Sequence, residues 1–187
     1  MKSRLTPLNE EQISSEQRQI LDAILQGPRG NLDGPFLAWI HSPALADHAQ
    51  QLGAFCRYKT RLPLRLSELA ILVTAQAWQS QAEWQIHEPI ALENGLDPIQ
   101  IEAIRCGDTP VFSREDEQLV YQVARAMYQS KRVPDVLYHA AVDHFGEPAM
   151  VELIGILGYY SLVAMTLNAF QVDRESDKPL PFEENCS

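Results

Sequence analysis

The segment from Ser67 to Trp78 (SELAILVTAQAW) has an apolar residue at most of its positions. A helix without a polar face is usually buried on all sides, so this segment predicts a central helix of the core. Its only ionisable residue is Glu68. In a first helical turn a glutamate complements the helix dipole, whereas a buried carboxyl has a raised pKa and acts as a base or proton relay. From this residue alone we favour the dipole interpretation.

A second helix is predicted to begin directly after it, at Ser80-Gln81-Ala82-Glu83. This is the pattern of a capping box, in which the serine and the glutamate each satisfy a backbone N–H. Glu83 and His87 are four residues apart and share one helix face. Such a carboxylate can hold the imidazole in one tautomer for general acid–base catalysis, or the two form an ordinary surface pair. Trp84 either walls a pocket or packs in the core.

The other turn and capping signals predict an all-α fold, because no useful stretch alternates apolar and polar residues as a strand does. We expect about seven to nine helices in an oligomeric protein. Residues 1–34 are predicted to form an arm and a helix that opens with a capping box at Ser14. A domain is expected over 35–172, and residues 173–187 are expected to form an exposed tail or an arm over a neighbouring subunit. The remaining helices are expected at Pro43–Arg57, from Pro98 to near Gly107, from Ser113, from Pro134 to Phe145, and at Ala149–Phe170.

The charge and the cysteine usage limit the classes of function. A net charge of −10 and a pI near 4.9 argue against binding to nucleic acid or to an anionic membrane surface. Three cysteines without framework spacing, and no apolar signal region at the N-terminus, predict a cytoplasmic protein. The long apolar segment Ala149–Phe170 contains Glu152 and has acidic flanks, so we interpret it as a buried or subunit-interface helix rather than a membrane span.

No metal or cofactor site is predicted. The five histidines are scattered, and neither H-x-x-x-H nor H-E-x-x-H is present. The glycine-containing loop at 27–34 does not follow a strand and lacks the Gly-Lys-Ser/Thr of a phosphate loop. We therefore expect a small-molecule substrate without a cofactor.

The segment around Glu68 resembles the core motif of the carboxymuconolactone decarboxylase and AhpD-like alkylhydroperoxidase superfamily. In the peroxidase branch a glutamate is followed, twelve residues later, by Cys-x-x-Cys-x-x-x-His. The same offsets here give Glu68, then Ser80-x-x-Glu83-x-x-x-His87, so both cysteine positions are replaced. The decarboxylase branch lacks these cysteines and has a glutamate four residues before the histidine and a later Asn-Gly, which Glu83, His87 and Asn94-Gly95 match. The resemblance extends over roughly residues 35–172 and implies an AhpD-like fold and trimers or hexamers.

Three functions follow as hypotheses. The first is a lyase-type enzyme without a cofactor, acting on a small organic acid or lactone, with catalytic residues His87, Glu83 and Glu68. Its substrate-binding candidates are Ser80, Trp84 and Arg65. Arg65 belongs to a series of arginines at positions 57, 61 and 65, which either binds the carboxylates of a substrate or forms a solvated helix face. The second is a peroxidase-type redox protein, which the missing cysteine pair disfavours because serine cannot form a disulfide. The third is an oligomeric binding protein without catalysis.

Overall fold

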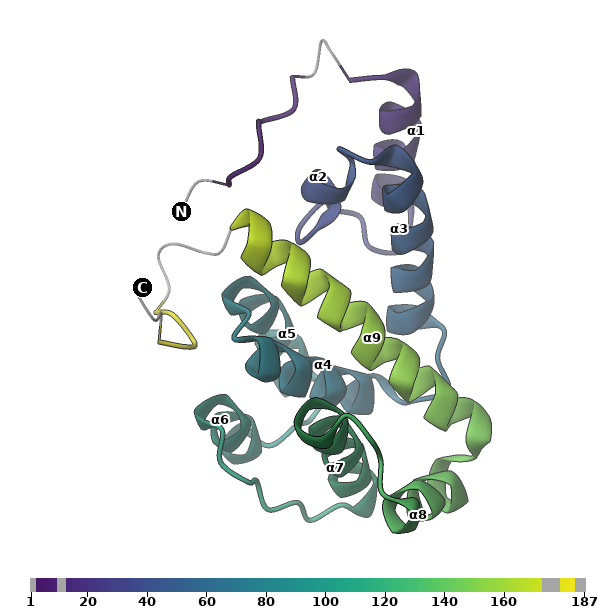
Figure 1. Ribbon diagram of the computed structural model, residues 1–187, viewed down its shortest axis with the longest axis vertical. Coiled ribbons are helices and arrows are strands. Elements are labelled where there is room, and N and C mark those ends of the chain that lie inside the picture. The colour runs from purple at the N-terminus through teal and green to yellow at the C-terminus, as the bar shows by residue number, and fades with distance from the viewer. Residues whose placement is uncertain (1–2, 10–12, 173–178, 184–187) are drawn as a thin grey trace.

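The computed structural model describes residues 3–9, 13–172 and 179–183, and this part of the chain contains helices and no strands. The all-α prediction is confirmed, and the helices begin and end close to the predicted residues, except for the short α2, which was not predicted. They are α1 (Ser15–Gln26), α2 (Phe36–Trp39), α3 (Pro43–Tyr58), α4 (Leu64–Trp78), α5 (Gln81–Glu93), α6 (Pro98–Cys106), α7 (Glu115–Ser130), α8 (Asp135–Phe145) and α9 (Glu147–Phe170) (Figure 1).

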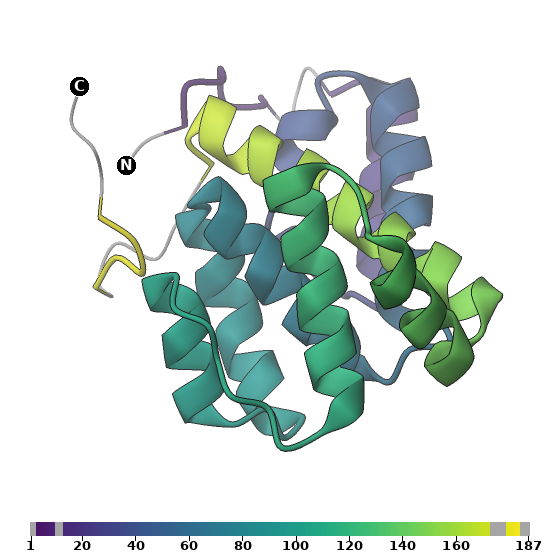
Figure 2. The ribbon, with the colours of Figure 1, turned by 60° about the horizontal axis from the view of Figure 1, so that its bottom comes forward.

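Helix α4 lies at the centre of the bundle, as its apolar sequence predicts. It packs against α9 on one side, against α6 and α7 on the other, and against α5, which follows it in the chain (Figure 2). Every residue from Leu66 to Ala75 is buried, including Glu68. The helix begins at Leu64, so Glu68 lies beyond its first turn and has no role at the helix dipole. The dipole interpretation of Glu68 is therefore wrong, and its carboxyl lies in the core.

Helix α9 crosses the bundle and separates α1–α3 from the helices around α4 (Figure 1). It contacts α3, α4, α5 and α8. It is the one helix among the described residues that is long and apolar enough to span a membrane, and most of its apolar stretch is buried against the other helices. This matches the predicted core helix, since a helix that is apolar all round needs neighbours on every side.

The junction between α4 and α5 is tight. Gln79 adopts the left-handed conformation with φ 51°, and the backbone N–H of Ser80 donates to the carbonyl of Ala75 at 2.8 Å. Ser80 is the N-cap of α5, but its side chain makes no capping hydrogen bond. The predicted capping box is wrong here, because Glu83 is buried instead of turning back to the helix end. The capping box predicted at Ser14 is confirmed.

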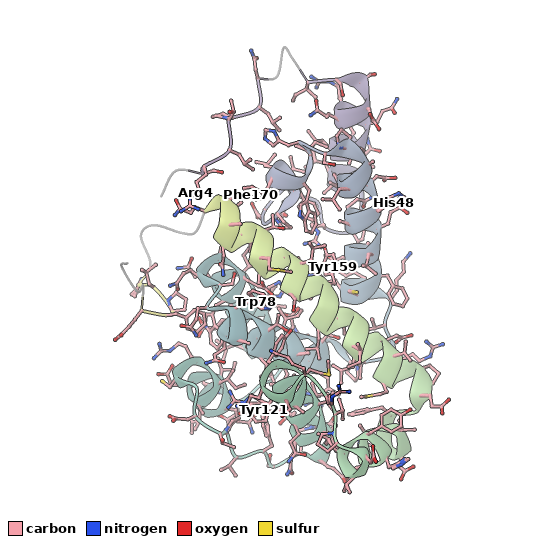
Figure 3. The ribbon with its side chains drawn as sticks, viewed as in Figure 1. Arg4, His48, Trp78, Tyr121, Tyr159 and Phe170 are labelled. Atoms are coloured by element: carbon pink, nitrogen blue, oxygen red, sulfur yellow. The ribbon has the colours of Figure 1, made fainter. Side chains whose placement is uncertain are left out.

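Described segments near both ends of the chain contact the bundle. The backbone N–H of Arg4 donates to the carbonyl of Phe170 at the end of α9, where Figure 3 shows the two residues together. Near the C-terminus, Pro181 and Phe182 are buried, and Phe182 exchanges two backbone hydrogen bonds with the side chain of Gln81. The expectation of an exposed tail is wrong for these two residues, while residues 173–178 and 184–187 of the tail lie outside the described chain.

Candidate functional site

A cavity of about 160 Å³ lies between the loop after α1 and helices α3, α5 and α9. Apolar side chains of α5 and α9 form much of its wall, among them Ile86, Ile90 and Val163. A dry cavity of similar volume in another protein binds benzene, so this one has room for a ligand built on a single small ring. The polar and charged residues that line it include Arg29, Asp33, Arg57, Glu83, His87, Tyr159 and Tyr160.

Glu83 and His87 line this cavity together, one turn apart on α5. The Glu83 side chain is 1% exposed, and neither of its carboxyl oxygens has a hydrogen-bond partner among the described residues. Burial without a charge partner raises the pKa of Glu83 well above its ordinary value. The group is therefore held as a neutral carboxylic acid, because an ionised carboxylate there would be an unpaired buried charge.

His87 pairs with a carboxyl other than the predicted one. Its Nδ1 lies 2.6 Å from Oε2 of Glu68, a residue of α4 that is fully buried. The prediction that Glu83 orients His87 is therefore wrong, since α4 brings Glu68 to the ring instead. A carboxylate can only accept, so an ionised Glu68 places the hydrogen of this bond on Nδ1 and leaves Nε2 outside the pair. The pair holds the imidazole in the tautomer that a general base requires.

Tyr160 is a site residue that sequence reasoning missed. Its ring meets the ring of His87 edge to face, with the centroids 5.1 Å apart. Its hydroxyl is buried and has no hydrogen-bond partner among the described residues. Burial and the neighbouring Glu68 raise the pKa of Tyr160 well above its usual range, so it stays a phenol. The Tyr-Tyr pair at 159–160 was the only signal, and no pattern tied it to His87.

Tyr159 of α9, labelled in Figure 3, lines the cavity. It packs where Gly53 of α3 has no side chain: a Cβ built on Gly53 would lie 2.1 Å from the hydroxyl oxygen of Tyr159. Position 53 requires glycine because the Tyr159 ring lies so close to the backbone of α3 that any side chain would push the ring away. Gly53 thus sets the position of this cavity wall.

The three arginines of the series at positions 57, 61 and 65 have different partners in the structure. Arg57 lines the cavity, and so does Arg29 from the loop after α1. Neither arginine forms an ion pair with a described residue. Arg61 binds Glu152, through both its backbone N–H and its guanidinium. Arg65 binds Asp116 at 2.6 Å and also Glu117 on α7. Arg65 does not line the cavity, because these two carboxylates hold its guanidinium against α7.

The other two predicted substrate-binding residues also lie outside the cavity lining. Ser80 is fully buried at the α4–α5 junction, and its hydroxyl has no hydrogen-bond partner among the described residues. Trp84 is buried and packs edge to face against Phe182, with the ring centroids 5.3 Å apart. Of the two interpretations of Trp84, the structure supports core packing.

The described cysteines are poorly suited to thiolate chemistry. Burial, with a contribution from Glu152, raises the pKa of Cys56 to about 11. Cys106 is exposed, and its hydrogen bond to Glu102 raises its pKa. A thiol reacts as its thiolate, so both cysteines are in the less reactive form at neutral pH. No group of three or more histidine, cysteine, aspartate or glutamate residues in the described chain is arranged to hold a metal ion.

One protein-family model matches part of the chain. Residues 43–126 match the carboxymuconolactone decarboxylase family, and this range contains Glu68, Ser80, Glu83 and His87. No curated protein matches the chain.

Solved structures share the fold at low sequence identity. An uncharacterized peroxidase-related protein from Ralstonia eutropha JMP134, with an alkylhydroperoxidase AhpD core, has a TM-score of 0.75 at 16% identity and covers 94% of this chain and 93% of its own. A peroxidase-related protein from Silicibacter sp. TM1040 has a TM-score of 0.74 at 11% identity, with coverages of 94% and 93%. The debrominase Bmp8, solved as a cysteine-to-alanine variant with 2,3,4-tribromopyrrole, has a TM-score of 0.72 at 18% identity and covers 94% of each chain. The chain is thus similar to the carboxymuconolactone decarboxylase family over residues 43–126, and it shares its fold with AhpD-like proteins.

Proposed function

We propose that this chain is an enzyme that uses general acid–base catalysis, without a cofactor, on a small organic acid or lactone. The reaction is a decarboxylation, an isomerisation or a hydrolysis. One observation supports the proposal above the others. His87, bonded to buried Glu68, shares a cavity with Glu83, an unpartnered and neutral carboxyl one helix turn away. An acid and a base held in different protonation states at one cavity are the equipment of proton-transfer catalysis.

The roles of the three residues follow from their surroundings. His87 accepts or returns a proton through Nε2, because Nδ1 is engaged by Glu68. Glu68 positions the ring and stabilises the imidazolium that forms. Glu83 donates to an oxygen of the substrate. In a decarboxylation, the electrons of the breaking carbon–carbon bond move toward that oxygen and carbon dioxide leaves. His87, which has taken a proton from solvent at Nε2, then gives that proton to the carbon, so one solvent proton replaces the carbon dioxide.

Two arginines at the cavity, whose guanidinium groups contact the rings of Phe36 and Tyr58, favour an anionic substrate. Arg29 and Arg57 line it without forming ion pairs to described residues, against the single carboxylate of Asp33 and the neutral Glu83. A guanidinium binds a carboxylate through paired N–H donors. Together with the cavity volume, this supports a carboxylate attached to one small ring.

The thiol peroxidase is the weaker candidate. The positions that hold cysteines in the peroxidase branch are Ser80 and Glu83, and the described cysteines have raised pKa values. The chain therefore resembles the branch without cysteines. A peroxide-consumption assay on a variant with all three cysteines changed to serine tests this directly, because equal consumption before and after the change excludes a thiol mechanism.

The test of the proposed activity follows a panel of small oxo acids and carboxylated lactones by proton NMR. For a compound that is converted, His87→Ala should lower turnover by about 10²- to 10⁴-fold. His48→Ala is the matched control, since His48 is exposed on α3 (Figure 3). Equal turnover by wild type and His87→Ala would contradict the mechanism. Binding of a panel member without any conversion would favour a binding protein instead.

We also propose a homo-oligomer, a trimer or hexamer as the family resemblance implies. Exposed apolar side chains along one helix support it: Leu45, Leu52, Phe55 and Tyr58 on α3 are each at least 40% exposed. Surface of this kind is common at interfaces between subunits. Light scattering after size exclusion gives the mass directly, and a monomer at micromolar concentration would contradict the proposal.

A further inference from the structure

Two buried hydroxyl-bearing groups at the cavity have no partner within the described chain. They are the carboxyl of Glu83, on α5, and the phenol of Tyr160, on α9. Buried polar groups in folded proteins are nearly always hydrogen-bonded, so each such group needs an explanation. Because both line the cavity that His87 also lines, a ligand in that cavity is the natural partner for both.

The chemistry of the two groups defines the ligand atom they suit. A neutral carboxylic acid and a phenol each offer one O–H donor. The raised pKa values of Glu83 and Tyr160 keep both protons in place. An oxygen with two lone pairs accepts two such bonds, and it accepts them more strongly as it gains negative charge. A carbonyl oxygen that becomes an enolate oxygen during reaction has this property.

We propose that Glu83 and Tyr160 bind the oxygen of an enolate, and that the cavity also catalyses α-proton exchange on small cyclic ketones. This rests on the proposed function, because His87 is the base in both reactions. It extends that function to substrates that carry no carboxylate and lose no carbon dioxide. Tyr160 thereby becomes a catalytic residue for which the sequence motif has no counterpart.

The step balances without any further reactant. His87 Nε2 takes a proton from the carbon next to the carbonyl, and the C–H electron pair becomes a carbon–carbon double bond. The carbonyl π electrons move to oxygen, which the O–H groups of Glu83 and Tyr160 stabilise. The imidazolium exchanges its proton with solvent and returns one to the same carbon. The net change in deuterium oxide is replacement of hydrogen by deuterium.

The size and walls of the cavity indicate the substrate class. A volume of about 160 Å³ with apolar walls from Ile86, Ile90 and Val163 fits a five- or six-membered ring. Cyclohexanone has one ring, one acceptor oxygen and exchangeable α-hydrogens, so it is the probe of choice. It has no negative charge for Arg57 or Arg29, so its exchange tests the enolate site apart from the arginines.

The activity test measures loss of the α-hydrogen signals of cyclohexanone in deuterium oxide by NMR. Wild type should accelerate exchange above buffer, and His87→Ala should return it to the buffer rate. Tyr160→Phe and Glu83→Leu should each lower the enzymatic rate by about 10²- to 10³-fold, as loss of one oxyanion donor does. Tyr138→Phe, at an exposed tyrosine on α8, is the matched control and should exchange at the wild-type rate.

A second readout does not depend on turnover. The infrared carbonyl stretch of bound cyclohexanone should shift to lower frequency in the wild type, because two O–H donors polarise the bond. Tyr160→Phe should reverse part of this shift, and Glu83→Gln, which keeps an N–H donor, should preserve more of it than Glu83→Leu. Circular dichroism confirms that each variant is folded.

The two proposals fail in distinguishable ways. If acids or lactones are converted through His87 but the carbonyl stretch is the same in wild type and Tyr160→Phe, the enolate site is wrong and the proposed function stands. If the stretch shifts as expected but no acid or lactone is converted, the enolate site stands and the proposed substrate class is wrong. Exchange of cyclohexanone at equal rates in wild type and His87→Ala overturns the α-proton activity.

Discussion

Replacing Glu83 with glutamine should change how the stability of the protein depends on pH. In the unfolded chain this carboxyl titrates near its ordinary pKa of 4.5, whereas burial raises its pKa well above that value in the folded protein. Between these two values the folded state binds the proton and the unfolded state does not. A rise in pH therefore favours unfolding, and the contribution of Glu83, complete below pH 4.5, is lost as the pH rises through this window.

The slope of the unfolding free energy against pH determines how large the effect of Glu83 is. A group that is protonated only in the folded state lowers the unfolding free energy by about 1.4 kcal/mol for each pH unit within the window. Glutamine has nearly the same shape and does not titrate, so Glu83→Gln lacks this slope. Its unpartnered amide adds a cost of about 1–3 kcal/mol, but that cost is the same at every pH.

Urea unfolding at pH 5, 6, 7 and 8 measures this difference. The stability of Glu83→Gln relative to wild type should increase by about 1.4 kcal/mol from pH 5 to pH 6 and continue to increase while the window lasts. Glu93→Gln, at the exposed end of the same helix, should run parallel to wild type. If the wild-type and Glu83→Gln curves are parallel over this range, Glu83 is ionised in the folded protein and the acid role assigned to it fails.

Three further changes test how the site is held. Arg65→Met should cost about 3 kcal/mol in urea unfolding, because it removes the buried cation of Asp116 and Glu117 and leaves them only the exposed Arg114, yet any turnover should persist while the protein is folded. Phe182→Ala should cost about 2 kcal/mol by exposing the surface under the tail, and a change below 0.5 kcal/mol would mean that the tail does not dock in solution. Gly53→Ala should cost about 1–3 kcal/mol through the clash with Tyr159, and Tyr159→Phe should relieve part of that cost.

The sequence was sufficient for the helices because their signals are local. The apolar run before Trp78, the proline at Pro98 and the glycine at Gly107 mark ends that depend on neighbouring residues alone, and each appears in the structure as predicted. The same locality places Glu83 and His87 at one cavity, since residues four apart share a helix face.

The partners of these residues could not be predicted, because they depend on how helices pack. Glu68 reaches His87 from α4, nineteen residues earlier in the chain, and Tyr160 reaches it from α9. The Ser-x-x-Glu pattern also fits a capping box, and only the burial of Glu83 decides against one. The arginine series at positions 57, 61 and 65 has equal spacing, but the acidic residues of α7 and α9 determine that Arg61 and Arg65 form ion pairs.

Glu83 and His87 differ in protonation because different neighbours surround them. They lie one turn apart on α5, and no feature of that helix alone separates an acid from a base. Glu68 gives His87 a buried carboxyl partner, while Glu83 is buried without a hydrogen-bond partner among the described residues. A neutral acid and an oriented base can then coexist at one pH, which two mutually paired residues could not. In the predicted pair, Glu83 and His87 would have bonded to each other. In the structure the packing of α4 pairs His87 with Glu68 instead, and this leaves both Glu83 and the far side of the His87 ring available to a substrate.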